Sequence, residues 1–86
     1  MVERVRSYRG ISTRAALGYL ESVGGEQTGE DTVAGDGWRA SVSAEKVSIG
    51  PSIQLTEVTV AFEADSDDVL DPVVEAFSQK AIRAGG

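Results

Sequence analysis

The feature that most constrains the fold is a change of hydrophobic period along the chain. Between Trp38 and Phe62 apolar residues recur at alternate positions, which is typical of strands that bury one face. On both sides of this region the apolar residues follow the spacing of an amphipathic helix. Because the chain has 86 residues, we expect a single domain over residues 1–86, in which helices pack on one sheet.

The N-terminal part predicts a strand and then a helix. Residues Val2 to Arg9 mix charged and apolar side chains, which indicates a strand near a sheet edge. Ser12 is suited to cap a helix, with Ile11 as the hydrophobic staple before it. Gly24-Gly25 should end this helix, with Gly24 in the left-handed cap. Its apolar stripe consists of Ala16, Leu17, Leu20 and Val23.

The next segment predicts short strands separated by turns. Residues Glu26 to Ala34 indicate one weak strand or a pair of short ones, and Gly35-Asp36-Gly37 is a strong turn signal. A half-buried strand follows from Trp38 to Ser43. We expect a turn at Ala44-Glu45, after which Val47 and Ile49 continue the alternation.

The longest apolar strand is expected next, in a central position. Pro51 in Gly50-Pro51-Ser52 fits the second position of a β-turn. Ile53 and Leu55 then have the opposite parity from the apolar residues Val58, Val60 and Phe62. We therefore expect a bulge near Thr56-Glu57 that brings both sets onto the core face.

The C-terminal part predicts a second helix behind an acidic connector. The connector runs from Asp65 to Asp71, and Asp71-Pro72 is interpreted as the cap and first helical residue. Gly85 closes the helix. Its apolar stripe consists of Leu70, Val73, Val74, Phe77, Ala81 and Ile82. The order β-α-β-β-β-β-α predicts the α+β class, with one antiparallel sheet and both helices on one face.

Composition excludes several kinds of chemistry. The chain has no Cys and no His, so it lacks thiol nucleophiles, thiolate or imidazole metal ligands and the Ser-His-Asp arrangement. Its net charge of −6 argues against nucleic-acid binding and, with few Lys, suggests a salt-loving source. We see no signal peptide and no stretch near the roughly 20 apolar residues of a membrane span. A cytoplasmic location without membrane attachment is therefore expected.

An acidic run and a basic patch are the two charge clusters of the sequence. A cation site and helix capping are the two interpretations of Asp65, Asp67, Asp68 and Asp71. Capping is favoured, and no metal or cofactor is predicted, because Val69 and Leu70 fall where ligand and glycine should be. Arginines crowd the first fourteen residues: Arg4, Arg6, Arg9 and Arg14.

Four residues are candidates for binding a ligand or partner. Arg4, Arg6 and Tyr8 should share one strand face, because side chains alternate along a strand. They could receive an anion or acidic partner; the favoured alternative is ion pairing to the acidic connector. Trp38 is either a stacking or interface residue or, as we favour, a lid on the core. No catalytic residue is predicted.

The glycines permit one further interpretation. Gly24, Gly25 and Gly29 lack the spacing of a phosphate-binding loop and follow a helix instead of opening one. The terminal Gly85-Gly86 matches the conjugation tail of ubiquitin-like proteins and sulfur carriers. Here it directly follows an amphipathic helix, where glycine is the expected cap.

Two stretches, VSIGPSIQLTEVTVAFEAD and VEAFSQKAIRAGG, carry a family resemblance. With SYRGIS and AGDGW, they make the chain similar to the C-terminal domain of MoaD-related proteins. That small family occurs alone in salt-loving archaea and fused behind a β-grasp sulfur-carrier domain in some bacteria. The resemblance implies the stand-alone form, a TBP-like β-α-β(4)-α fold and a link to molybdopterin or sulfur-carrier biology. It transfers no active-site residue.

Three functions compete at this point. The leading hypothesis is a non-enzymatic accessory or interaction domain, with a sulfur carrier or another protein as partner. The second is a small-molecule binding domain with a groove between C-terminal helix and sheet, lined by Tyr8, Trp38, Phe62 and Phe77. An enzyme is the third, and it would have to use carboxylates, Arg, Lys or Tyr. A homo-oligomer is compatible with each.

Overall fold

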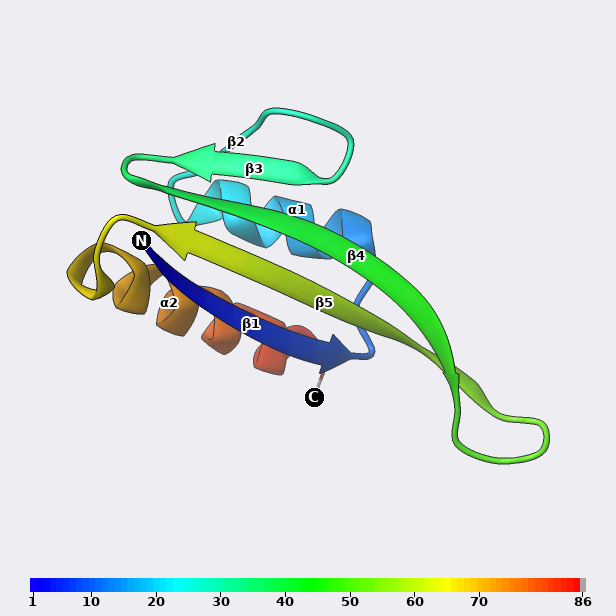
Figure 1. The fold of residues 1–86 in the computed structure, drawn as a ribbon. Helices are drawn as coiled ribbons and strands as arrows, with labels where there is room; N and C mark the ends of the chain where they lie inside the picture. Colours follow the sequence, from blue (N-terminus) through cyan, green and yellow to red (C-terminus); the bar gives the residue numbers. More distant parts are fainter. Residues whose placement is uncertain (86) are drawn as a thin grey trace.

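The computed structural model describes residues 1–85, and Gly86 lies outside the described part. Its elements follow the predicted order: β1 (Val2–Arg9), α1 (Thr13–Ser22), β2 (Glu26–Gln27), β3 (Thr32–Gly35), β4 (Trp38–Ser48), β5 (Gln54–Ala64) and α2 (Asp67–Gly85). The strands form one antiparallel sheet in the order β1-β5-β4-β3-β2. Both helices lie on the same face of the sheet (Figure 1), which confirms the predicted α+β class.

Helix α1 begins and ends where local sequence signals predict. The Ser12 side chain accepts a hydrogen bond of 3.0 Å from the Ala15 amide, as an N-cap does. At the other end the Gly25 amide donates to the Leu20 carbonyl and the Gly24 amide to the Glu21 carbonyl. These are the two bonds of a Schellman motif, and Gly24 supplies its left-handed residue with φ at +108°.

The edges of the sheet are unequal. β1 pairs only with β5 and is therefore an edge strand, as predicted, whereas β5 lies between β1 and β4. The opposite edge is β2, which has only 2 residues. The pair of short strands expected between Glu26 and Ala34 is confirmed as β2 and β3, with β3 ending at Gly35. β1 is thus open along its whole length, and β4 beyond Val42 also has no strand on its β3 side.

The core lies between the sheet and the two helices. The rings of Phe62 on β5 and Phe77 on α2 meet edge to face, with centroids 5.6 Å apart. No polar or charged side chain is buried among residues 1–83, for which burial is described. The core side chains are Ile11, Ala16, Leu20, Val33, Trp38, Ala40, Val42, Val58, Val60, Phe62, Ala64, Leu70, Val74, Phe77 and Ala81. In the described part, neither helix has an apolar stretch long enough for a membrane crossing.

The prediction of a turn at Ala44-Glu45 is wrong. β4 runs without interruption to Ser48, and Ala44 pairs with Val58 while Glu45 pairs with Glu57. Neither residue is a glycine or proline, so nothing in the local backbone opposes an extended conformation. The chain reverses instead between Ser48 and Gln54, where the Gly50-Pro51-Ser52 signal predicts.

The bulge expected near Thr56-Glu57 is also wrong. The β4–β5 register is regular through this region, with Lys46 opposite Thr56 and Val47 opposite Leu55. Ala44 and Thr56, on the helix side of the hairpin, are exposed, so the helices do not cover this part of the sheet. Figure 1 shows the hairpin extending beyond both helices. Without a core there, no gain in burial favours a change of register.

Helix α2 begins at Asp67, four residues before the predicted cap at Asp71. The Ser66 carbonyl accepts from the Leu70 amide at 3.2 Å, and Asp67 and Asp68 lie in the first turn, where the helix dipole favours negative charge. Leu70 is fully buried, so the earlier start adds a core contact. Pro72 is therefore inside the helix and not at its first position.

Candidate functional site

β1 presents the three N-terminal candidates to the side on which α2 packs. Arg4, Arg6 and Tyr8 alternate with residues that face the helix-free side, as predicted. Figure 1 shows α2 running behind β1 and β5. The three side chains nevertheless have different surroundings, which separates their roles.

Arg4 is ion-paired to the acidic segment. Its Nη2 lies 2.7 Å from Asp67 Oδ1 and 3.6 Å from Asp71 Oδ1, with the Arg4 side chain 33% exposed. Its Nη1 donates to the Glu3 carbonyl at 2.9 Å. The favoured alternative, that the basic patch pairs with the acidic connector, therefore holds for Arg4. No group of three acidic side chains placed to hold a metal ion was found in the part of the chain described.

Arg6 is exposed and lacks a carboxylate partner among residues 1–85. Its Nη1 donates instead to the carbonyl of Val5 at 2.9 Å. A guanidinium has five N–H donors. Most of the hydrogen-bonding capacity of Arg6 is thus available to a partner.

Tyr8 is held in place by α2. Its hydroxyl lies 2.7 Å from Ser78 Oγ, and its ring meets that of Phe77 edge to face at 5.2 Å. Tyr8 therefore ties the edge strand to the core. It contributes to the site by fixing β1, because its polar group is already paired within the domain.

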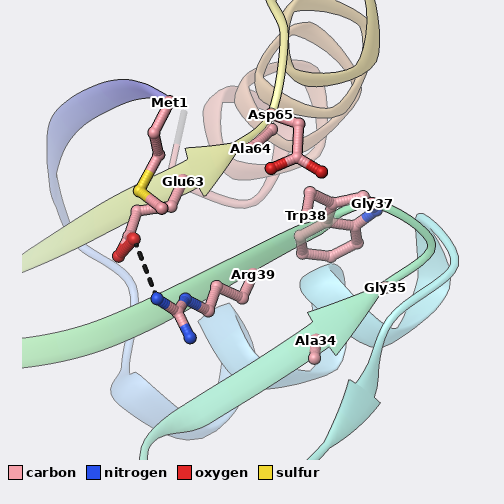
Figure 2. A pocket seen from close by; sticks show the side chains of 9 residues that line it. All are labelled: Met1, Ala34, Gly35, Gly37, Trp38, Arg39, Glu63, Ala64 and Asp65. Atoms are coloured by element: carbon pink, nitrogen blue, oxygen red, sulfur yellow. Dashed lines mark hydrogen bonds and ion pairs between the residues drawn. The ribbon is translucent and has the colours of Figure 1, made fainter.

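Trp38 lies away from β1, at the end of the sheet where β3 turns into β4. Only 6% of the Trp38 surface is exposed. The indole packs against Gly35 and Gly25, and a Cβ at either position would overlap the ring. Trp38 thus acts as a lid on the core. Trp38 also lines an open hollow of about 360 Å³. Figure 2 shows the residues around it, which include the ion pair of Arg39 and Glu63, 3.2 Å apart.

Around β3 and the neighbouring parts of β4 and β5, the helix-free face of the sheet carries mainly small, polar and charged side chains. A second hollow, of about 520 Å³, lies there between β3 and β5. Its lining includes Thr32, Ser41 and Ala61, with Thr28 and Thr32 joined through their hydroxyls at 3.1 Å. No charged group is concentrated in it beyond the paired Arg39 and Glu63.

Four apolar residues lie at the far end of the β4–β5 hairpin: Val47, which is half-buried, and Ile49, Ile53 and Leu55, which are exposed. Val47 faces Leu55 across the ladder, and the Ile49 amide donates to the Ile53 carbonyl at 3.0 Å. The isoleucine side chains are more than half exposed. These four residues form the hairpin patch, which neither helix covers.

The open edge of β1 presents unpaired backbone N–H and C=O groups, which sequence reasoning missed. In an antiparallel ladder each residue directs both backbone polar groups toward one side. The Val42 amide donates to the Asp31 carbonyl at 2.8 Å, so even-numbered residues of β4 point to β3 and odd-numbered ones to β5. Thr59, opposite Ser43, therefore bonds β4.

The same alternation passes from β5 to β1. Val60 must bond β1, where its partner is Arg6. The backbone groups of even-numbered β1 residues are thus used within the sheet. Those directed outward belong to Glu3, Val5, Ser7 and Arg9. The alternating pattern of β1 shows which residues share a face, but only the strand order shows which of them line the open edge.

Comparison with known families gives a match over almost the whole chain. The family model described as archaeal MoaD-like protein matches residues 4–86. A search among curated proteins finds no match. The matched range includes Arg4, Arg6, Tyr8 and Trp38, together with most of the open edge of β1.

Proposed function

The chain belongs to the archaeal MoaD-like protein family, and we propose that it is a small non-enzymatic interaction domain that serves a sulfur-carrier or molybdopterin system. The observation that carries this proposal is the placement of the polar groups. Among the described residues every charged side chain is at the surface, and the interior holds only apolar ones. A function that uses these charges acts through surface contact.

The distribution of charge supports contact with a protein. The first fourteen residues hold four Arg and one Glu, which gives this segment a net charge of +3. Because the whole chain has a net charge of −6, the remaining residues carry a net charge of −9. A surface with opposite charges in separate regions steers and orients a complementary partner. The absence of His and Cys leaves few groups for general acid–base or nucleophilic catalysis at neutral pH.

The small-molecule alternative has less support. Tyr8, Trp38, Phe62 and Phe77 were expected to line a groove between α2 and the sheet. The rings of Tyr8 and Phe62 each meet the ring of Phe77 edge to face, and these three rings fill that space. Of the four residues, Trp38 alone lines one of the two hollows on the sheet, the one beside the Arg39–Glu63 ion pair.

The conjugation hypothesis concerns Gly85-Gly86, and Gly86 lies outside the described residues. α2 extends to Gly85. Intact mass measurement on protein from its own cells tests the hypothesis directly. A covalent adduct at Gly86 would make the chain itself a carrier and would replace the accessory role proposed here.

Affinity purification from the native cells tests the proposed function. A tag between Pro51 and Ser52 sits at the tip of the β4–β5 hairpin, where an insertion is tolerated and both chain ends stay free. We expect a sulfur carrier, its activating enzyme or a molybdopterin-synthesis protein in stoichiometric amount. We also expect a deletion strain to lose molybdopterin content, with recovery on complementation. Unchanged molybdopterin content together with none of these proteins would contradict the proposal.

A further inference from the structure

We propose that the open edge of β1 is the docking site, and that it receives an extended acidic segment of the partner protein as an added strand. This inference rests on the proposed function and names the surface and the partner chemistry. Addition of a strand to a free sheet edge is a recurring mode of peptide recognition, in which main-chain hydrogen bonds supply affinity.

The edge has the length and free groups that strand addition needs. β1 has 8 residues, and the backbone groups of Glu3, Val5, Ser7 and Arg9 point away from β5. Val5 is 57% exposed, in agreement with an uncovered edge. The carbonyls of Glu3 and Val5 each accept one guanidinium N–H, which leaves a second lone pair for an incoming amide.

The positive charge of Arg4 and Arg6 beside the β1 edge favours an acidic partner segment. Arg6 projects toward the helix side of the edge with no carboxylate partner among the described residues. Arg4 lies two residues away, held by Asp67. An added strand places alternate side chains on that same side. Carboxylates at those positions would meet Arg6 and extend the ion pairs of Arg4.

A second copy of the chain fits this edge less well. Outward-pointing residues must face one another for two β1 strands to bond, which fixes the parity of the pairing. The two symmetric registers that pair the most β1 residues are centred on Val5, which places Arg4 opposite Arg6, and on Arg6, which places Arg6 opposite itself. Like charges directly opposite each other destabilise a strand pair. The same arginines attract an acidic strand.

The test uses the peptide acetyl-TEVETEV-amide and its glutamine counterpart acetyl-TQVQTQV-amide as probes of the whole protein. NMR titration and amide hydrogen exchange report binding residue by residue. We expect the glutamate peptide to slow exchange at the Val5 and Ser7 amides and to bind about tenfold more tightly than the glutamine peptide at low salt. Raising the salt concentration should reduce this difference.

Two variants separate edge pairing from charge. Val5→Pro removes an outward N–H and leaves the β1–β5 ladder intact, because proline is tolerated where the amide faces solvent. In this variant the glutamate peptide should no longer slow amide hydrogen exchange along β1. Arg6→Glu should weaken binding of the glutamate peptide about 3- to 10-fold, whereas Lys46→Glu, which has the same change in charge on β4, should not.

The outcomes are distinct. Shifts confined to another surface, equal affinity for the two peptides, or full binding by both Val5→Pro and Arg6→Glu would overturn the docking site. Amides of Val5 and Ser7 already protected in free protein of dimer mass would overturn it in favour of a second copy. If the peptide binds as expected but the deletion strain keeps its molybdopterin content, the docking site stands and the proposed link to molybdopterin is rejected.

Discussion

Gly35 and Trp38 face each other across the β3–β4 hairpin, and the indole occupies the space that a side chain at position 35 would need. Gly35→Ala should therefore force the indole out of its place and lower the free energy of unfolding by about 1–3 kcal/mol. Thermal or denaturant unfolding followed by Trp38 fluorescence measures this change in stability.

Gly18→Ala is the matched control, since a Cβ at Gly18 meets nothing within 4 Å. In the interior of α1 it should raise stability by about 0.5–1 kcal/mol. An unchanged stability of the Gly35 variant would mean that Trp38 does not fill this space.

Pro72 lies inside α2, beyond the first turn. It cannot donate the hydrogen bond that another residue would give to the carbonyl of Asp68. Replacement of this exposed residue by Ala should raise the free energy of unfolding by about 1–3 kcal/mol. Urea denaturation measures the change. A neutral or destabilising effect would place Pro72 at the first helical position, as the sequence alone suggested.

Ile53 and Phe62 belong to the same strand region but to different environments. Ile53 is 56% exposed in the hairpin patch, so Ile53→Thr should change the free energy of unfolding by less than about 0.5 kcal/mol. Phe62→Ala, in the fully buried core, should cost about 3–5 kcal/mol. Unfolding midpoints of the two variants distinguish the regular register from a bulged one. A comparably large cost at Ile53 would support the bulge.

Arg4 and Asp67 form an ion pair across 2.7 Å at the surface. A double-mutant cycle with Arg4→Gln and Asp67→Asn should give a coupling energy of about 0.2–1 kcal/mol. The coupling should decrease at high salt because the pair is solvent-accessible. A coupling of several kcal/mol that is insensitive to salt would show a desolvated pair, contrary to the exposure of Asp67.

Local signals in the sequence predicted local structure well. The cap at Ser12, the left-handed residue at Gly24 and the reversal at Gly50-Pro51-Ser52 each depend on backbone preferences within a few residues. The element order and the edge position of β1 were also predicted, because they follow from periodicity and charge. These features need no knowledge of the tertiary contacts.

Two of the three errors, the bulge and the start of α2, concern features that depend on tertiary contacts. A bulge at Thr56-Glu57 was expected because Ile53 and Leu55 are apolar and were assumed to be buried. The helices end short of this part of the hairpin, so these side chains are outside the core. Pro72 was interpreted as the start of a helix from its local preference, whereas burial of Leu70 favours the longer helix.

The candidate site was predicted only in part. Sequence alternation placed Arg4, Arg6 and Tyr8 on one face of β1, but it could not show that Tyr8 bonds Ser78 while Arg6 stays without a carboxylate partner in the described chain. Nor could it assign the outward groups of Val5 and Ser7, because that assignment follows from the register of three strands. The binding role of these residues stays a prediction.

Amide hydrogen exchange along β1 of the free protein tests the central claim most directly. If the edge is open, the amides of Val5 and Ser7 should exchange rapidly, while those of Arg4, Arg6 and Tyr8, bonded to β5, should be strongly protected. This alternation should not depend on protein concentration. Uniform protection along the strand, or protection of Val5 and Ser7 that increases with concentration, would show a covered edge and contradict the proposed docking site.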